Sequence, residues 1–203
     1  MKKTITLVEL ILATVLLMTI ILSATSLDIA TRYFFKSSDL KAKVLNEASL
    51  ITEHIAKNAL FSVGEGGLKV SADDGDITKR AFSVSADGNR LKIRQDLRSD
   101  NNYYQSLDTP QDSNDDRCVE YMFDSTTHTV TYARYTNYNC TGTSQTITLT
   151  NKLMPLQGEK YVTYDPTHPF RIAISLKLRH NPAKAADSKT NPEMDLKTAL
   201  FVH

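Results

Sequence analysis

Glu9 is the residue of this 203-residue chain whose type and position most strongly suggest chemistry. It is a carboxylate at the start of an apolar run, and the eighteen residues that follow it, Leu10 to Leu27, carry no charge. A charged side chain inside a membrane segment costs on the order of 2–3 kcal/mol, even on the more permissive insertion scales. We therefore expect the Glu9 carboxylate to need a positively charged partner within the bilayer.

The apolar run allows three interpretations. A secretory signal peptide would combine a basic start, here Lys2-Lys3, with a small-residue cleavage site, for which Ala24-Thr25-Ser26 is a candidate. A plain membrane anchor fits the length better, because eighteen uncharged residues suffice to enter a hydrocarbon core about 30 Å thick. Neither of these two interpretations gives a reason for Glu9.

The third interpretation rests on a resemblance. The segment from Thr4 to Leu10, Thr-Ile-Thr-Leu-Val-Glu-Leu, resembles the amino-terminal signature of type IV prepilins and pseudopilins. The resemblance implies that a prepilin peptidase cleaves between Thr4 and Ile5, that the new amine is methylated, and that Glu9 becomes the fifth residue of the mature chain. Members of the family normally have glycine before the cleavage site, where this chain has Thr4.

The same resemblance implies a partner for Glu9. In the family, this glutamate pairs with the α-amine of a neighbouring subunit as the helices bundle into a filament. Two unit charges about 4 Å apart attract each other by about 4 kcal/mol at an effective dielectric constant near 20. Glu9 would then set the axial register of one helix on the next.

The elements that must position Glu9 begin with one long helix. No glycine precedes Gly64 and no proline precedes Pro110, so nothing interrupts a helix predicted from about Leu7 to Leu60. Such a helix is about 80 Å long. Its second half is amphipathic, with apolar residues spaced by three or four: Leu40, Val44, Ala48, Ile51, Ile55 and Ala59. The aromatic residues 33–35 suit the level at which the helix leaves the membrane.

After Phe61 the apolar residues recur with a period of two, which predicts antiparallel strands. Two hairpins are predicted, with turns at Ala86–Asn89 and Asp124–His128. The strands are predicted at residues 81–85, 90–94, 119–123, 129–135, 146–150, 170–178 and 196–202. Residues 179–193 hold two prolines and small polar residues, and we expect a long loop there. The predicted fold class is α+β and pilin-like, with the long helix packed on an antiparallel sheet.

The order of these elements resembles that of minor pilins and of type II secretion minor pseudopilins of the J and W types. We accordingly divide the chain into a basic leader (1–4), a transmembrane stem helix (5–30), the amphipathic half of the same helix (31–62) and a β-rich head (63–203). The head, at about 140 residues, is large enough to bury a sizeable core.

Cys118 and Cys140 are the two cysteines of the chain, and both lie in the head. If the basic flank Lys2-Lys3 stays in the cytoplasm, the head is exported. An even number of cysteines in an oxidising compartment favours a disulfide over two unrelated buried thiols. We therefore predict a Cys118–Cys140 bridge, which would stabilise the head by roughly 3 kcal/mol.

Other candidate sites are weaker. An acidic stretch could hold calcium but lacks the glycine and the terminal glutamate of a dedicated loop, so a solvated loop is favoured; it contains Asp108, Asp112, Asp115 and Asp116. The five histidines are scattered, and we expect them at the surface or in turns rather than as metal ligands: His54, His128, His168, His180 and His203. We expect no metal and no cofactor. The chain also lacks a Gly-x-Ser-x-Gly elbow and a phosphate-binding glycine loop.

Two further properties bear on binding partners. A group of tyrosines could form a binding surface, although cross-strand packing is the favoured explanation for most of them: Tyr103, Tyr104, Tyr132, Tyr135 and Tyr138. The net charge is +1, from 24 basic and 23 acidic side chains, so no nucleic acid partner is expected.

The sequence therefore predicts a structural protein rather than an enzyme, a minor pilin or pseudopilin. Its expected partners are other pilin or pseudopilin subunits, a prepilin peptidase and the bacterial inner membrane before assembly. Its expected place is a single pass through that membrane with the head outside the cytoplasm, and then a pilus or pseudopilus. The alternative is an extracytoplasmic binding domain on an uncleaved anchor.

Overall fold

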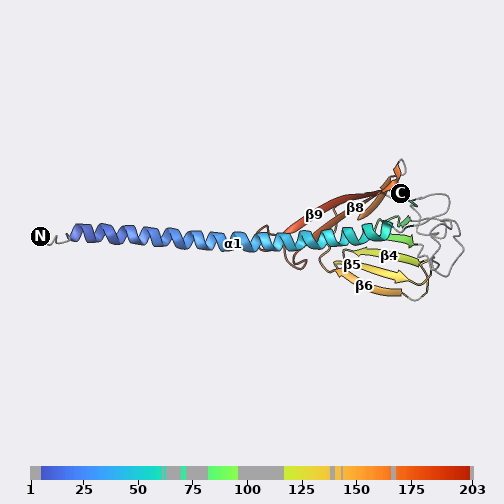
Figure 1. Cartoon of the computed structure of the whole chain (residues 1–203), viewed down its shortest axis with the longest axis horizontal. Coiled ribbons are helices and arrows are strands. Elements are labelled where there is room, and N and C mark those ends of the chain that lie inside the picture. Colours follow the sequence, from blue (N-terminus) through green and yellow to red (C-terminus); the bar gives the residue numbers. More distant parts are fainter. Residues whose placement is uncertain are drawn as a thin grey trace, which may run out of the picture.

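A single helix dominates the computed structural model (Figure 1). The structure describes residues 6–60, 62, 70–71, 82–95, 117–137, 140–142, 144–165 and 168–201. Helix α1 runs without interruption over Leu7–Leu60, 54 residues or about 80 Å, which confirms the predicted helix. With neither glycine nor proline inside it, no residue of α1 weakens or blocks the backbone hydrogen bonds.

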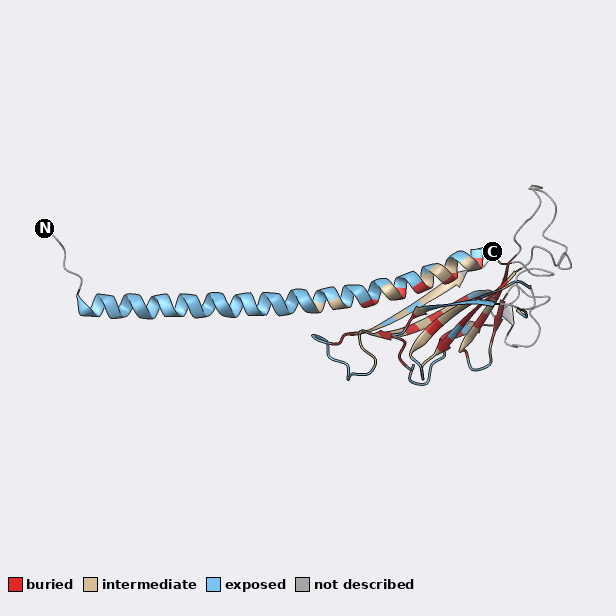
Figure 2. Ribbon diagram, turned by 90° about the horizontal axis from the view of Figure 1, so that it is seen from below, coloured by how far each residue is buried: buried red, intermediate tan, exposed pale blue. Residues whose placement is uncertain are grey.

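The two halves of α1 have different surroundings (Figure 2). In the N-terminal half, the large apolar side chains from Leu7 to Phe35 are each more than half exposed. We call Leu7–Phe35 the stem. By length and composition this part of the helix could cross a membrane, with a mean hydropathy of 2.5 in its most apolar window, although a signal sequence passes the same test. In the C-terminal half, the predicted apolar stripe is buried at Val44, Ala48, Ile51, Ile55 and Ala59.

Six strands form the first sheet of the head, in the order of the sequence. They are β1 (Val70–Ser71), β2 (Phe82–Val84), β3 (Arg90–Gln95), β4 (Arg117–Asp124), β5 (Thr129–Tyr135) and β6 (Ser144–Thr150). The strands β2 to β6 pair antiparallel, and this confirms both predicted hairpins and the predicted strand β6. The short strand β1 was not predicted, and it pairs parallel with β2.

Three strands form a second, antiparallel sheet: β7 (Val162–Asp165), β8 (His168–Arg179) and β9 (Glu193–Phe201). Strand β8 confirms the prediction, and the long loop between β8 and β9 lies where it was expected, at residues 180–192. Strand β7 was not predicted. Strand β9 begins at Glu193, three residues before the predicted start at Leu196.

The core lies where α1 crosses the two sheets. Figures 1 and 2 show the C-terminal half of the helix over the junction between the sheet of β4 to β6 and the sheet of β8 and β9. Residues of both sheets pack against its buried stripe, including Phe82, Leu91, Tyr121, Ile172 and Leu176. The fold is therefore α+β, with a long helix packed on antiparallel strands.

A turn and a connecting segment join the two sheets to each other. Val162 N of β7 donates to Gly88 O in the β2–β3 turn (3.0 Å), and Leu153 N of the connecting segment donates to His128 O in the β4–β5 turn (2.9 Å). Between β6 and β7, Leu153 forms a bridge to Leu178 of β8. The head consequently behaves as one packed unit rather than two independent sheets.

The disulfide between Cys118 and Cys140 is present, with Cα atoms 5.0 Å apart, as the sequence predicts. It ties the start of β4 to the segment after β5. The Cys118 side chain is fully buried.

Candidate functional site: the stem and its attachment to the head

Glu9 closes the N-terminus of α1 through a capping box with Thr6. Thr6 N and Thr6 Oγ1 donate to Glu9 Oε2 at 2.9 and 3.0 Å, and Glu9 N donates to Thr6 Oγ1 at 3.3 Å. The two residues thereby satisfy backbone N–H groups that the helix itself leaves unpaired, and the carboxylate lies at the positive end of the helix dipole. Glu9 therefore has a local structural role as well as a candidate role between subunits.

This capping box was missed by the sequence interpretation, which gave Glu9 a reason only through the family resemblance. Its signal is present in the sequence as Thr6-x-x-Glu9 ahead of an apolar run. Both carboxylate hydrogen bonds end on Oε2, and no donor to Oε1 is found among the residues that the structure describes. The predicted cleavage site, Thr4 and Ile5, lies outside the described residues.

Six serine and threonine hydroxyl groups of the stem are satisfied within the helix. Each donates to a carbonyl three or four residues earlier, at 2.7 to 2.9 Å: Thr14, Thr19, Ser23, Thr25, Ser26 and Thr31. In lipid, where water is absent, such internal bonds remove the cost of an unpaired hydroxyl. The stem thus presents a largely apolar surface on which these serine and threonine hydroxyl groups are satisfied.

The first attachments of the helix to the head lie along one side of α1. Ser37 Oγ donates to the carbonyl of Ser188 in the β8–β9 loop (2.9 Å). Further along, Glu47 accepts hydrogen bonds from Thr150 Oγ1 and from Lys152 Nζ, and its contact with Lys152 is an ion pair with both side chains about three-quarters buried. These polar contacts fix the height of the head along the helix.

A cluster of ring and amide groups forms the last attachment. The His54 ring packs edge-on against Tyr121 and Tyr132, with ring centroids 5.7 and 4.7 Å away, and His54 Nδ1 lies 2.8 Å from the Tyr121 hydroxyl. Asn58 Nδ2 donates to the same hydroxyl (2.6 Å), while Asn58 Oδ1 accepts from Gln95 Nε2 (2.9 Å). The cluster joins the C-terminal turns of α1 to β3, β4 and β5.

Burial in this cluster shifts three pKa values. It lowers the pKa of His54, with a smaller contribution from the positive charge of Lys57, and it raises the pKa of the Tyr121 and Tyr132 hydroxyls. The expectation that His54 is a surface or turn residue is therefore wrong, because its ring packs between helix and sheet. His128 does lie in a turn, where its Nδ1 is 2.8 Å from Leu153 O.

The two tyrosines of the candidate binding surface that the structure describes, Tyr132 and Tyr135, do not share one face of the sheet. Tyr132 faces the helix beside Tyr121, whereas Tyr135, three residues later on β5, points to the opposite face and donates to Glu120 Oε2 (2.7 Å). Burial and the neighbouring carboxylate of Glu120 raise the pKa of Tyr135 to about 12. Tyr103, Tyr104 and Tyr138 lie outside the described residues.

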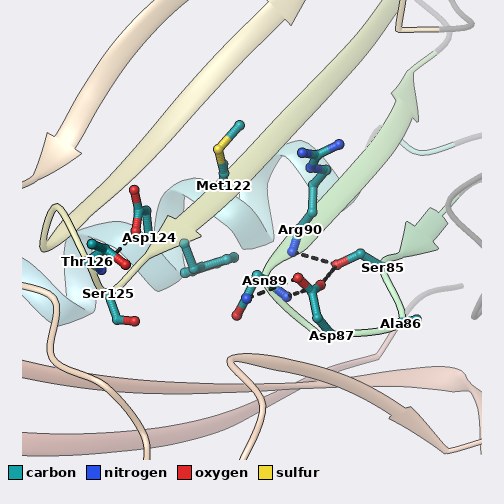
Figure 3. Close-up of a pocket in the computed structure, with 10 residues that line it drawn as sticks. Ser85, Ala86, Asp87, Asn89, Arg90, Met122, Asp124, Ser125 and Thr126 are labelled. Atoms are coloured by element: carbon teal, nitrogen blue, oxygen red, sulfur yellow. Dashed lines mark hydrogen bonds between the residues drawn. The ribbon is translucent and has the colours of Figure 1, made fainter.

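A pocket of about 530 Å³ lies between the two predicted hairpin turns (Figure 3). The two carboxylates that line the pocket accept hydrogen bonds from residues of the hairpin turns in which they lie. Asp87 accepts from Ser85 Oγ and from Asn89, and Asp124 accepts from Thr126 N and Thr127 Oγ1. These hydrogen bonds lower the pKa of both aspartates, so they stay ionised as turn residues and are not poised as proton donors.

Metal binding gains no support from the described part of the chain, where no three His, Cys, Asp or Glu side chains gather closely enough to hold an ion. The predicted acidic stretch, Asp108, Asp112, Asp115 and Asp116, lies outside it. The features that stand out are therefore the exposed apolar stem, the capped Glu9 and the attachments that carry the head.

Comparison of the chain with protein-family models and with curated proteins found no match.

Proposed function

We propose that this protein is a structural subunit of a filament, a minor pilin of a type IV pilus or a minor pseudopilin of a type II secretion pseudopilus. The stem inserts in the inner membrane, the head lies on its far side, and the stem later packs among the stems of other subunits. The amino-terminal resemblance around Glu9 supports the family, and the arrangement of stem and head supports the role.

One observation carries this proposal. A single unbroken helix presents an almost uncharged apolar surface over its first half and holds a packed head with its second half. Exposed apolar area of this extent is unfavourable in water by roughly 25 cal/mol per Å². The stem therefore requires a lipid or protein environment, and a bundle of like helices supplies the second.

Glu9 then acts at the end of the stem. In an isolated subunit its carboxylate is held by Thr6, which reduces the cost of the charge, and no oppositely charged side chain of the described residues pairs with it. An α-amine from a neighbouring subunit supplies that charge. Because Oε2 already serves the cap, the amine approaches Oε1, and the capping box orients the carboxylate for it.

The first experiment is mass spectrometry of the mature amino terminus. Ile5 as the first residue supports a processed filament subunit, and a chain that begins at Met1 supports an uncleaved anchor. A chain that begins at Leu27 supports simple secretion and contradicts the proposal.

The second experiment separates the charge of Glu9 from its capping role. Glutamine at this position of a capping box still reaches back to the cap residue, so Glu9→Gln keeps the cap and removes the charge. The proposed pairing predicts that Glu9→Gln and Glu9→Leu both insert in the membrane and both fail to enter filaments. Assembly of Glu9→Gln at the wild-type level would show that the cap alone matters.

An uncleaved membrane anchor that carries an extracytoplasmic binding domain is the second candidate. It is favoured by Thr4, which stands where the family has glycine before the cleavage site. It predicts Met1 at the mature terminus and no effect of either Glu9 variant on function.

A further inference from the structure

The β8–β9 loop, residues 180–192, is the part of the head that reaches back furthest toward the stem. Figure 2 shows the end of the head that faces the N-terminus formed by an exposed loop, and the Ser37–Ser188 hydrogen bond places the β8–β9 loop beside Ser37 of α1. Ser37 lies ten residues beyond Leu27, the last residue of the uncharged run, or about 15 Å along the helix.

When the stem spans the membrane, the position of Ser37 along α1 lies close to the bilayer surface. The polar headgroup layer extends roughly 5–7 Å beyond the hydrocarbon core on each side. The loop then lies within about one Debye length, roughly 8 Å at physiological salt, of the headgroups. Charges on the loop consequently feel the surface potential of the membrane.

The charge at this level is positive. Between Asp28 and Lys43 of α1 and within the β8–β9 loop, six lysines and arginines stand against three aspartates, whereas the whole chain carries a net charge of only +1. On the loop itself the basic residues are Lys184 and Lys189, both exposed. The acid between them, Asp187, accepts hydrogen bonds from Lys189 N and Thr190 N and serves the turn.

Hydrogen bonds within the β8–β9 loop hold its backbone in a defined conformation. Asn191 is only 3% exposed, and its Nδ2 donates to the carbonyls of Asn181, Lys184 and Ala185. Its Oδ1 accepts from Asn181 N (2.7 Å). Arg179 Nη1 also donates to Lys184 O (3.0 Å). The two lysines are thus presented from a rigid support, which lowers the entropy lost on contact with a surface.

From this height, charge and rigidity we propose that the β8–β9 loop is a docking surface for the anionic phospholipid headgroups of the membrane that holds the stem. Lys184 and Lys189 contact the phosphates, together with Lys36 on the adjacent turn of α1. The contact holds the head down on the bilayer before the subunit is assembled. It rests on insertion of the stem, and it does not depend on cleavage or on Glu9.

The test uses the full chain in nanodiscs. Both native cysteines are bonded to each other, so a fluorophore can be placed on an introduced thiol at the exposed loop position Ala186→Cys. Quenching by a headgroup-labelled lipid is measured in phosphatidylcholine and in mixtures that contain phosphatidylglycerol. Each lysine near an anionic surface raises the bound population about fivefold. We expect stronger quenching with phosphatidylglycerol, and reversal of the increase at high salt.

Matched variants decide the result. Lys184→Gln with Lys189→Gln is expected to remove most of the increase, at least about fivefold in bound population. The control double variant, Lys57→Gln with Arg171→Gln, removes the same charge at positions away from the loop. Lys57 lies near the C-terminal end of α1, and Arg171 lies near the start of β8, at the other end of that strand from the loop. This variant is expected to behave like the wild type. Equal quenching in both lipids, or equal effects of the two double variants, overturns the proposal.

The proposed filament function is tested separately, with filament assembly in cells as the measurement and the same Glu9→Gln protein examined in nanodiscs. Glu9→Gln is expected to abolish filament assembly while leaving the lipid-dependent quenching of the loop unchanged. If Glu9→Gln still assembles into filaments while its loop is quenched as in the wild type, only the role of Glu9 is overturned. If the wild-type loop is quenched equally in both lipids while Glu9→Gln fails to assemble, only the docking surface is overturned.

Discussion

Replacement of Gly88 by alanine is expected to weaken the junction between the two sheets of the head. Gly88 has a φ of +71°, and a Cβ placed on it would lie 2.4 Å from Lys160 Cβ and 2.7 Å from the Val162 carbonyl oxygen. Val162 N is also the donor to Gly88 O that joins β7 to the β2–β3 turn. The substitution therefore strains the backbone and pushes the two sheets apart at the same point.

The magnitude follows from two contributions. A residue other than glycine in the left-handed region costs about 1–2 kcal/mol. Crowding in a packed site costs about 1–3 kcal/mol more, because the nearest atoms belong to a backbone carbonyl and to a Cβ, which cannot swing away. The chain offers a matched control, since Gly158 has a φ of +73° and nothing within 4 Å of its added Cβ. Gly158→Ala should show the first contribution alone.

Thermal unfolding of the full chain in detergent micelles measures the difference. For a protein of this size, 1 kcal/mol corresponds to a shift in Tm of about 2–4 °C. Gly88→Ala is therefore expected to lower Tm by about 6 °C more than Gly158→Ala does. Equal shifts for the two variants would refute the reasoning, because they would show that the sheets do not meet tightly at Gly88.

Three other predictions concern the head. Replacing Cys118 and Cys140 together by serine should lower the free energy of unfolding by about 3 kcal/mol in urea titrations, and a smaller loss than 1 kcal/mol would contradict this. Tyr121→Phe leaves the polar groups of His54 and Asn58 without their hydroxyl partner and should cost about 1–3 kcal/mol in the same assay. Burial lowers the pKa of His54 in the folded state, so the unfolded chain binds the proton more readily, and stability falls as the pH drops below about 6.5. This fall should be shallower in His54→Gln when Tm is measured between about pH 7.5 and about pH 5, and an unchanged profile would exclude His54 as its source.

The long helix and the hairpins were predictable because their signals are local. The absence of glycine and proline from Leu7–Leu60 and the apolar spacing of its second half are sufficient to predict α1. The β2–β3 turn, Ala86–Asn89, likewise carries its own turn residues. In each case the residues that determine the element lie within it.

The elements that were missed depend on distant partners. The four-residue strand β7 becomes a strand by pairing with β8, where Val162 lies opposite Ile174. The early start of β9 depends on Glu193, which forms ion pairs with Lys177 and Arg179 of β8 across the strand pair. A charged residue that directly follows a loop ending in proline, as Glu193 does, does not by itself predict a strand.

The residues of the candidate site also differ in whether their roles depend on local sequence or on distant partners. Glu9 was singled out from its place in the apolar run, and its cap by Thr6 is local enough that the spacing alone could have revealed it. The role of His54 could not be read from the sequence, because it requires Tyr121 of β4 and Tyr132 of β5 to meet the helix. Nothing in the residues next to His54 indicates those rings.

The uninterrupted backbone of α1 makes the protein mechanically stiff along its length. With no hinge along its 54 residues, any tilt imposed at the N-terminal end reaches the far end in full. Over about 80 Å, a pivot of about 10°, well within the range that membrane helices adopt, displaces the distal turns by about 14 Å. In the proposed filament, a sideways displacement of the head would tilt the stem by the same angle, so contacts among the heads and packing among the stems would be mechanically coupled.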